Sequence, residues 1–232
     1  MKLITKYMTN NDCYKAGRKI VPKGIMVHST ATPGIMAKDW FARWNKSYKA
    51  GEIDRQVCVH AFVDDTEIYQ YLPWDHRGWH AGGNANNTHI SFEICEPAGF
   101  CYVNNVMVGY DASKQEAYFR KAWENAVDLC VMLCQKFGLS EKDIICHSEG
   151  YKMGIASNHA DVMHWFPKHG ENMDTFRAAV KRALEGALSL DRADKEKKYY
   201  RVQVGAFSKR ENAEELLRKV KAAGFDGIIK YS

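Results

Sequence analysis

The sequence predicts an α/β domain with a mixed central β-sheet flanked by helices, followed by a small C-terminal β-α-β unit. Short apolar runs between turn residues indicate buried strands, and two long stretches with apolar residues three or four positions apart indicate helices. The two kinds of segment alternate along the chain, with one hairpin among them. The 232 residues, 46% hydrophobic and 26% charged, suffice for one ordinary domain and an appendage.

Several stretches read as strands because apolar residues alternate or run together: 25–27, 57–73 as a hairpin, 89–97 and 143–149. The first of them ends at His28 and the last contains His147. Residues 39–48 read as a short helix with aromatic side chains on one side. Two apolar strands are therefore expected to end in a histidine.

Two longer stretches carry a helical repeat. Residues 113–137 place their apolar side chains on one stripe, and Ser113 with Glu116 is expected to form a capping box. Gly138 fits the end of this helix. A second helix is expected over about 173–188, and the sheet is expected to lie against these helices.

Charge separates the end of the chain from the rest. The net charge is +5, and residues 191–232 hold eleven Lys and Arg against seven Asp and Glu. This mild surplus favours a tail with some affinity for polyanions, and no nucleic-acid partner is expected. Residues 189–198 read as a charged linker. Residues 199–232 read as a β-α-β unit, too small to bury a core alone, so we expect it to pair with a second copy as a homodimer or to dock elsewhere.

The compartment follows from what the sequence lacks. No run approaches the eighteen apolar residues of a membrane helix, and the first residues show no apolar signal region. We therefore expect synthesis in the cytoplasm without a signal peptide, and we expect no membrane partner.

The seven cysteines are odd in number and lack CxxC spacing. Buried free thiols are therefore expected in place of disulfides.

The densest group of metal-binding residue types is CHSEGYKMGIASNHADVMHW, residues 146–165, which otherwise reads as loop. A catalytic zinc uses three protein ligands and keeps a fourth position for water. The two strand-end histidines would supply two ligands, and the third would come from this loop. Its candidates are His159, Asp161 and His164. The alternative is that both strand-end histidines are satisfied core residues.

Three blocks together carry a family resemblance: VHSTATPG, HAFVDDTEIYQYLPWDHRGWHAGGNANNTHISFEICEP, and the block from residue 146 quoted above. In order and spacing they resemble the zinc-dependent N-acetylmuramoyl-L-alanine amidases shared by phages, bacteria and animal peptidoglycan-recognition proteins. The resemblance covers about residues 15–180 and is nearest to endolysins of phages with clostridium-like hosts. It implies that residues 1–188 form an amidase-like zinc domain that cleaves peptidoglycan between N-acetylmuramic acid and L-alanine. An endolysin would wait in the host cytoplasm and then act on the cell wall.

Carried over residue by residue, the resemblance makes His28, His147 and Asp161 the zinc ligands. The family has a Lys-x-Asp/Cys-Pro stretch at the third ligand, and here His159 takes the place of the lysine while Val162 replaces the proline. The choice between Asp161 and His159 as third ligand therefore stays open. By the same resemblance, His159 would donate a hydrogen bond to the oxyanion that forms at the scissile carbonyl.

The family's general base is an acid on a strand that HISFE matches, which assigns the role to Glu93. Glu96 is the weaker candidate, because strand alternation would point it to the opposite face as a solvated acid. His80 and Trp79 in GWHAGG are candidates for substrate binding, although large aromatics such as Trp79 are more often core. We expect the remaining histidines singled out to be structural or on the surface: His60, His76, His164 and His169.

The C-terminal unit resembles half of a SPOR repeat, a module that binds glycan strands, through VQVGAF and AEELLRKVKAAGF. Two rival functions remain. A peptidoglycan-recognition protein that has lost its metal would bind without cleaving. A cysteine peptidase would use Cys146 or Cys95 with a nearby histidine, and it would need an exposed thiol of low pKa.

Overall fold

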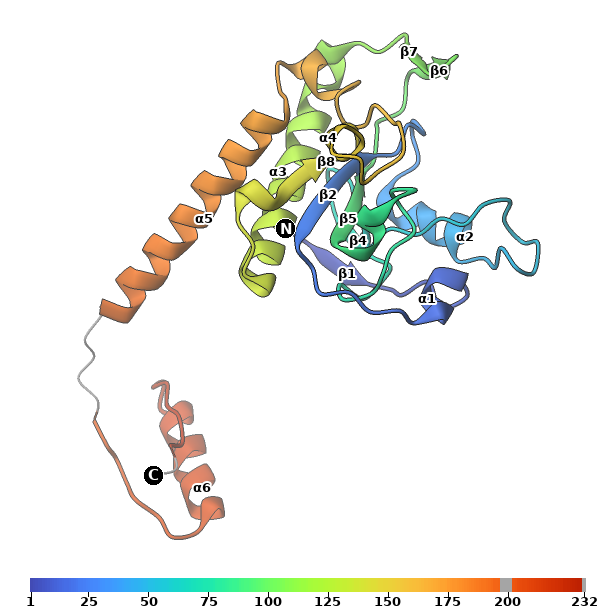
Figure 1. Ribbon diagram of the computed structural model, residues 1–232. Coiled ribbons are helices and arrows are strands. Elements are labelled where there is room, and N and C mark those ends of the chain that lie inside the picture. The colour runs from blue at the N-terminus through green and yellow to red at the C-terminus, as the bar shows by residue number, and fades with distance from the viewer. Residues whose placement is uncertain (197–201, 231–232) are drawn as a thin grey trace. The chain divides into compact units, whose positions relative to one another are not determined.

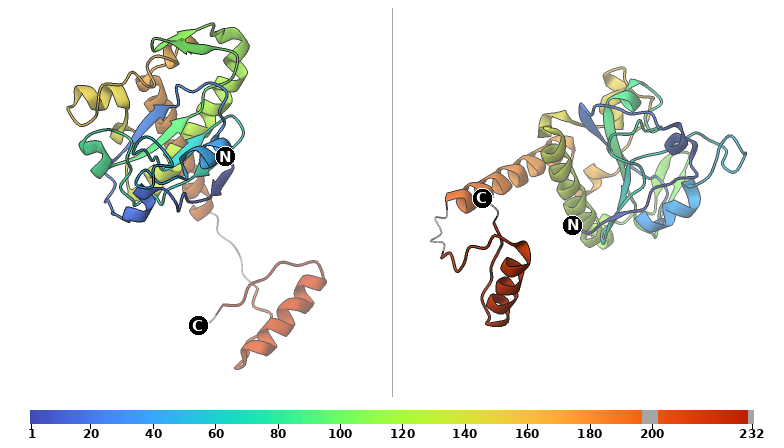
Figure 2. Two further views of the ribbon diagram at one scale, coloured as in Figure 1. Left: turned by 90° about the vertical axis from the view of Figure 1, so that its right-hand side faces the viewer. Right: turned by 90° about the horizontal axis from the view of Figure 1, so that it is seen from below.

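The computed structural model describes residues 1–196 and 202–230. Contacts divide the chain into two units, Met1–Leu188 and Ser189–Ser232. The first unit holds a six-stranded sheet in the order β1-β4-β3-β5-β2-β8, with helices against it (Figures 1 and 2). Only β3 and β4 pair antiparallel, and the other neighbours are parallel. The predicted mixed sheet flanked by helices is confirmed.

The strands of the sheet are β1 (Leu3–Thr5), β2 (Gly24–Ser29), β3 (Ala61–Val63), β4 (Ile68–Gln70), β5 (His89–Ile94) and β8 (Ile144–Cys146). A separate hairpin comprises β6 (Cys101–Val103) and β7 (Val106–Val108). The sequence predicted β2, β5, β8 and the β3–β4 hairpin. It missed β1 and the β6–β7 hairpin, whose residues are exposed or only partly buried and so do not show as buried apolar runs.

The helices are α1 (Asp12–Ala16), α2 (Trp40–Trp44), α3 (Ala112–Phe137), α4 (His147–Lys152), α5 (Met173–Glu196) and α6 (Arg210–Ala222), and the 3₁₀ turns are η1 (Ala37–Asp39), η2 (Asn84–Asn87), η3 (Glu141–Asp143) and η4 (Phe166–His169). Part of the segment expected as loop is therefore helical, in α4. The expected capping box of α3 is wrong: Asp111 caps the helix and accepts the backbone N–H groups of Ser113 and Lys114. Gly138 ends α3 with φ 67°, as predicted.

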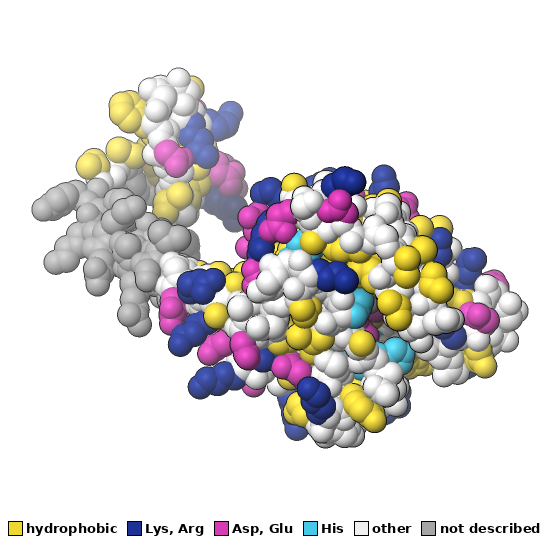
Figure 3. All heavy atoms as spheres, turned by 90° about the horizontal axis from the view of Figure 1, so that it is seen from above, with side chains coloured by type: hydrophobic (Ala, Val, Ile, Leu, Met, Phe, Trp, Pro, Cys, Tyr) yellow, Lys and Arg dark blue, Asp and Glu magenta, His cyan; other side chains and the backbone are white. Residues whose placement is uncertain are grey.

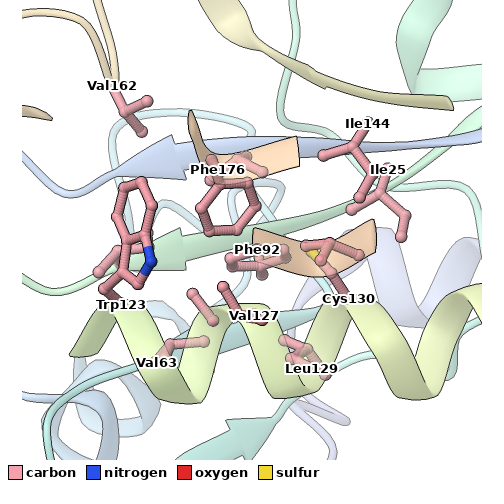
Figure 4. Close-up of a cluster of buried hydrophobic side chains, with 14 of the residues drawn as sticks. Ile25, Val63, Phe92, Trp123, Val127, Leu129, Cys130, Ile144, Val162 and Phe176 are labelled. Carbon is pink, nitrogen blue, oxygen red and sulfur yellow. The ribbon is translucent and has the colours of Figure 1, made fainter. Parts of the chain in front are cut away.

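Strand alternation gives the sheet two different faces. Ile25, Phe92 and Ile144 point to the face that α3 covers, where Trp123 and Val127 complete a buried apolar cluster (Figure 4). Met26 and Ile145, one position along their strands, belong to another cluster on the opposite face. His28 and Glu93 share that opposite face, because residues two apart on a strand point the same way.

The second unit forms less regular structure than the sequence predicts. Its described residues contain α6, while 202–207 and 225–230 run beside it without forming strands; the ends of the two expected strands, 199–201 and 231–232, lie outside the described residues. A strand needs a partner for its backbone groups, and a two-stranded unit of this size is marginal alone. The α5 helix also continues through 189–196 of the expected linker, whose residues 197–198 lie outside the described part. Within the described residues, no helix has the length and apolar character needed to span a bilayer.

Candidate metal centre and active site

Three side chains from separate segments meet where β2 and β8 end. These parallel strands pair Val27 with Cys146, so the next residues, His28 in β2 and His147 directly after β8, lie at the same end of the sheet. The Nδ1 atoms of the two histidines lie 3.1 Å apart. The Oδ2 atom of Asp161 lies 2.9 Å from Nδ1 of His28 and 3.6 Å from Nδ1 of His147. We call these three residues the donor cluster; its ligand atoms all lie within 4.8 Å of one another.

The donor cluster fits zinc in number, chemical type and spacing. Zinc bonds of about 2.0–2.2 Å to imidazole nitrogen and carboxylate oxygen place the donors of a tetrahedral site about 3.3–3.6 Å apart. Of the three separations, 3.6 Å lies within this range, and 2.9 Å and 3.1 Å lie slightly below it. His28 is 1% exposed and His147 is 3% exposed, so two of the donors are already withdrawn from bulk water.

The protonation tendencies of the cluster suit a cation. Burial lowers the pKa of His28 and outweighs the hydrogen bond and charge of Asp161, which favours the neutral imidazole. Burial would raise the pKa of Asp161, but hydrogen bonds and charges from His147 and His28 outweigh it and hold that pKa below its usual range. Metal binding needs neutral imidazole and ionised carboxylate, and these two groups favour those forms.

His80 lies against the outer nitrogen of His28. Its Nδ1 is 3.0 Å from Nε2 of His28, and the two rings meet edge to face. Burial lowers the pKa of His80 well below its usual value, so it is neutral and its Nδ1 can accept a hydrogen bond from His28. That tautomer places the proton of His80 on Nε2, a buried atom with no hydrogen-bond partner among the described residues. The contact between His80 and Nε2 of His28 thus fixes the orientation of the His28 ring, with Nδ1 facing Asp161.

Ser157 connects the outer nitrogen of His147 to His159. Its Oγ lies 3.2 Å from Nε2 of His147 and 3.1 Å from Nδ1 of His159, and it donates to the carbonyl of Ala81 at 3.1 Å. Gly82, next to that carbonyl, adopts φ 63°, and a Cβ there would lie 2.9 Å from Ser157 Oγ. The glycine therefore lets the two segments approach. Sequence reasoning missed Ser157, because a loop serine carries no distinguishing pattern.

Replacing Ser157 with alanine should lower zinc affinity by about 10–100-fold, because a ligand histidine would lose the group that orients it. Competition with a chromophoric chelator measures this affinity. Threonine at the same position keeps the hydroxyl and should restore most of the affinity. Ser113→Ala, which removes a hydroxyl at the start of α3, is the matched control and should leave affinity unchanged. Equal affinities for Ser157→Ala and the wild type would contradict this role.

Glu93 lies on β5, directly opposite His28 on the neighbouring parallel strand. Its Oε2 is buried without a hydrogen-bond partner among the described residues. Burial raises its pKa well above the usual value, and the charges of Asp161 and Glu96 raise it further. An unpartnered carboxyl beside the donor cluster is an arrangement suited to proton transfer.

Glu96 is buried, so the expectation of a solvated acid is wrong. It is 0% exposed and accepts hydrogen bonds from the hydroxyl of Tyr102 at 2.8 Å and from Nε2 of His164 at 3.0 Å. The strand ends at Ile94, so strand alternation no longer decides where Glu96 points. The hydrogen bond with His164 connects the segment after β5 to the segment after Asp161.

The other residues singled out from the sequence are not members of the donor cluster, although His159 lies next to it. His159 is exposed beside His147, with ring centroids 4.6 Å apart, and histidine side chains reach the surface of the face seen in Figure 3. Trp79 lines a separate pocket. The histidines expected to be structural include three that are buried and hydrogen-bonded: His60, His76 and His169.

The cysteines are free thiols, six of them buried and Cys101 exposed. Burial raises the pKa of Cys146 and raises that of Cys95 well above its usual value. Both thiols are therefore held in the protonated form, which is a poor nucleophile. These two thiols therefore give a cysteine peptidase no support, and among the described residues the donor cluster with Glu93 is the candidate for hydrolytic chemistry.

The chain resembles known proteins in sequence and in fold. The sequence of N-acetylmuramoyl-L-alanine amidase XlyA of Bacillus subtilis (strain 168) is 33% identical over 137 residues, which are 57% of this chain and 39% of that protein. The chain thus spans about two fifths of the length of this curated relative. The solved catalytic domain of XlyA matches with a TM-score of 0.55 at 28% identity, over 78% of this chain and 99% of that one. A mutant endolysin from Bacillus subtilis matches with a TM-score of 0.53 at 28% identity and the same coverage.

Two family models match the chain. A SPOR domain model matches residues 172–231, and it begins just before α5. A model described as N-acetylmuramoyl-L-alanine amidase matches residues 17–165, which include the whole donor cluster and Glu93. Because this second match covers more than half of the 232 residues, the chain belongs to the N-acetylmuramoyl-L-alanine amidase family.

Proposed function

We propose that the protein is a zinc-dependent peptidoglycan hydrolase that cleaves the amide bond between N-acetylmuramic acid and L-alanine. The observation that carries the proposal is the convergence of His28, His147 and Asp161 within 4.8 Å, inside the residues that the amidase family model matches. When bound there, zinc would supply a Lewis acid that polarises the scissile carbonyl and acidifies a water molecule. The three donor residues would hold it and leave room for water and substrate.

Glu93 would act as the general base. Its unpartnered Oε2 and its place on the strand beside His28 support this role, because a base must lie near the water whose proton it takes. His159 would donate a hydrogen bond to the oxygen that becomes negative as the tetrahedral intermediate forms. Its exposed ring beside His147 leaves it accessible to a bound substrate. The amine of L-alanine would then leave after taking up a proton.

The test is the appearance of new L-alanine amino ends in purified cell walls. We expect the wild type to release them, exhaustive chelation to stop the release, and added zinc to restore it. The rival, a binding module without metal, predicts wall binding with no new amino ends at any zinc concentration. The presence of all three donor residues in one cluster favours the hydrolase. Undiminished release from a protein shown by elemental analysis to contain no metal would contradict the proposal.

We further propose that the enzyme serves as a phage endolysin, held in the host cytoplasm until the wall becomes accessible. Its likeness to a solved endolysin from Bacillus subtilis supports this role. His80 and Trp79 would lie along the path of the substrate, since the first contacts His28 and the second lines the neighbouring pocket. Expression together with a membrane-permeabilising protein should lyse a susceptible host, whereas expression alone should leave cells intact.

For the second unit we propose wall binding as a homodimer. Six apolar side chains on the segments beside α6 support this, because a unit of this size cannot bury them by itself. They are exposed: Val202, Val204, Phe207, Phe225, Ile228 and Ile229.

Replacing both Phe225 and Ile228 with serine should therefore shift the protein from dimer to monomer in sedimentation velocity at micromolar concentration. Lys221→Ser, on the exposed surface of α6, is the control and should leave the dimer intact. A wild type that sediments as a monomer at every concentration would contradict dimerisation, while leaving the hydrolase proposal untouched.

A further inference from the structure

The pocket that Trp79 lines lies against residues 79–82, a segment that borders the donor cluster. In this segment His80 contacts His28, and the carbonyl of Ala81 accepts a hydrogen bond from the hydroxyl of Ser157. The neighbouring residues Trp79 and Gly82 line the pocket, which has a volume of about 370 Å³. Four residues span at most about 14 Å when extended, so the pocket and the donor cluster lie within the reach of a short bound peptide.

The pocket is built from hydrogen-bond donors and contains no acid. It is lined by Arg18, Gln56, Arg77, Trp79, Gly82 and Asn86. Two arginines thus line one pocket, and among the described residues neither Arg18 nor Arg77 forms a salt bridge with a carboxylate. Burial lowers the pKa of Arg77, and the charge of Arg18 lowers it further. Two like charges placed together without a counter-charge favour an anionic ligand.

Asn86 gives this pocket a fixed donor. It is 8% exposed, and its Oδ1 accepts the backbone N–H groups of His80 at 2.8 Å and Ala81 at 2.9 Å. These two bonds fix the orientation of the amide, so its Nδ2 points elsewhere, and it has no hydrogen-bond partner in the described part of the chain. Arg77 is fixed in a similar way, because its Nε donates to Oδ1 of Asn87 at 2.6 Å. Its two terminal nitrogens remain available for a bidentate contact.

We propose that this pocket binds a carboxylate of the stem peptide, next to the amide that the donor cluster would cleave. The inference rests on the proposed function, which supplies the peptide. In peptidoglycan the residue after L-alanine is D-glutamate joined through its γ-carboxyl group, so its α-carboxyl group is free unless amidated. Arg77 would take the two carboxylate oxygens, and Asn86 and Arg18 would complete the site. The planar guanidinium matches a carboxylate better than it matches a neutral amide.

The test compares two muramyl tripeptides that differ at one group, with isoglutamate or isoglutamine as the second residue. Arg77→Gln should raise KM for the isoglutamate substrate by about 10–100-fold, as expected for the loss of a charge-assisted contact, with little change in kcat. For the isoglutamine substrate KM should stay within about twofold. Arg43→Gln removes the same charge from an exposed site beside Trp40, and it should change neither substrate. Equal losses on both substrates would overturn the proposal.

Two further measurements keep the inference separate from the proposed function. Arg18→Gln should show the same selective loss, more weakly, if Arg77→Gln fails to fold. If the wild type cleaves neither substrate, the proposed function fails, and calorimetry with the free peptides L-Ala-D-isoglutamate-L-Lys and L-Ala-D-isoglutamine-L-Lys decides the pocket alone. Tighter binding of the first, lost in Arg77→Gln, supports the carboxylate site. Equal binding of the two peptides by the wild type overturns it.

Discussion

Replacing Asp161 with alanine is expected to release the metal and to lower kcat/KM on cell walls by about 10³-fold, roughly 4 kcal/mol of transition-state stabilisation. The carboxylate is the one anionic member of the donor cluster, and despite burial its pKa is held below its usual range, which favours its ionised form. Two neutral imidazoles alone would hold a divalent cation weakly. Elemental analysis after dialysis and the rate of release of L-alanine amino ends measure the two effects.

The same experiment decides between Asp161 and His159 as third ligand. Asp174→Ala, which removes an acid 89% exposed on α5, is the control and should keep both metal and activity. If His159 were the ligand, Asp161→Ala would retain one zinc per chain and His159→Ala would lose it. The distances favour Asp161, whose Oδ2 approaches Nδ1 of both other donors, whereas Nδ1 of His159 lies against Ser157.

Local patterns sufficed to place two members of the donor cluster. Apolar runs identified β2 and β8, and parallel pairing of the two strands brings their terminal histidines, His28 and His147, together. Asp161 lies on a loop without a periodic pattern, and the family resemblance was needed to single it out. Ser157 could not be found in this way, because its role depends on Ala81 and Gly82, which approach it from a distant part of the chain.

The sequence predictions that were wrong concern the cap of α3, the burial of Glu96 and the strands of the second unit. In each case the outcome depends on which interaction partner a group finds in the folded chain. Asp111 caps α3 in place of Ser113 because its carboxylate reaches two backbone N–H groups at once. Glu96 is buried because Tyr102 and His164, from later segments, satisfy its oxygens. The apolar alternation after residue 201 is typical of strands, yet 202–207 and 225–230 remain unpaired, because a strand forms only where a partner exists.

Replacing Glu93 with glutamine is expected to lower kcat by about 10²–10⁴-fold, the usual contribution of a positioned base, while zinc content and KM change little. Glutamine has nearly the same shape but cannot take a proton. Gln115→Glu, on the partly buried start of α3, changes the same pair of residue types at a distance and should leave kcat unaltered. A Glu93→Gln variant with wild-type kcat would remove Glu93 from the mechanism and leave the donor cluster unaffected.

The stability of the metal-free protein should report the environment of Glu93 independently of activity. Its folded pKa lies well above the ordinary value of 4.5, so the folded state holds a proton that the unfolded state has already lost. Stability from this group therefore falls as pH rises above about 4.5 towards the folded pKa. Urea unfolding of the metal-free wild type should show this fall as the pH rises above about 4.5, and Glu93→Gln should lack it. Zinc should reduce the difference, since a nearby cation favours the ionised carboxylate that a base requires. Parallel pH dependence of the two metal-free proteins would show that Glu93 ionises without cost, and its place as a carboxyl held ready beside the metal would have to be abandoned.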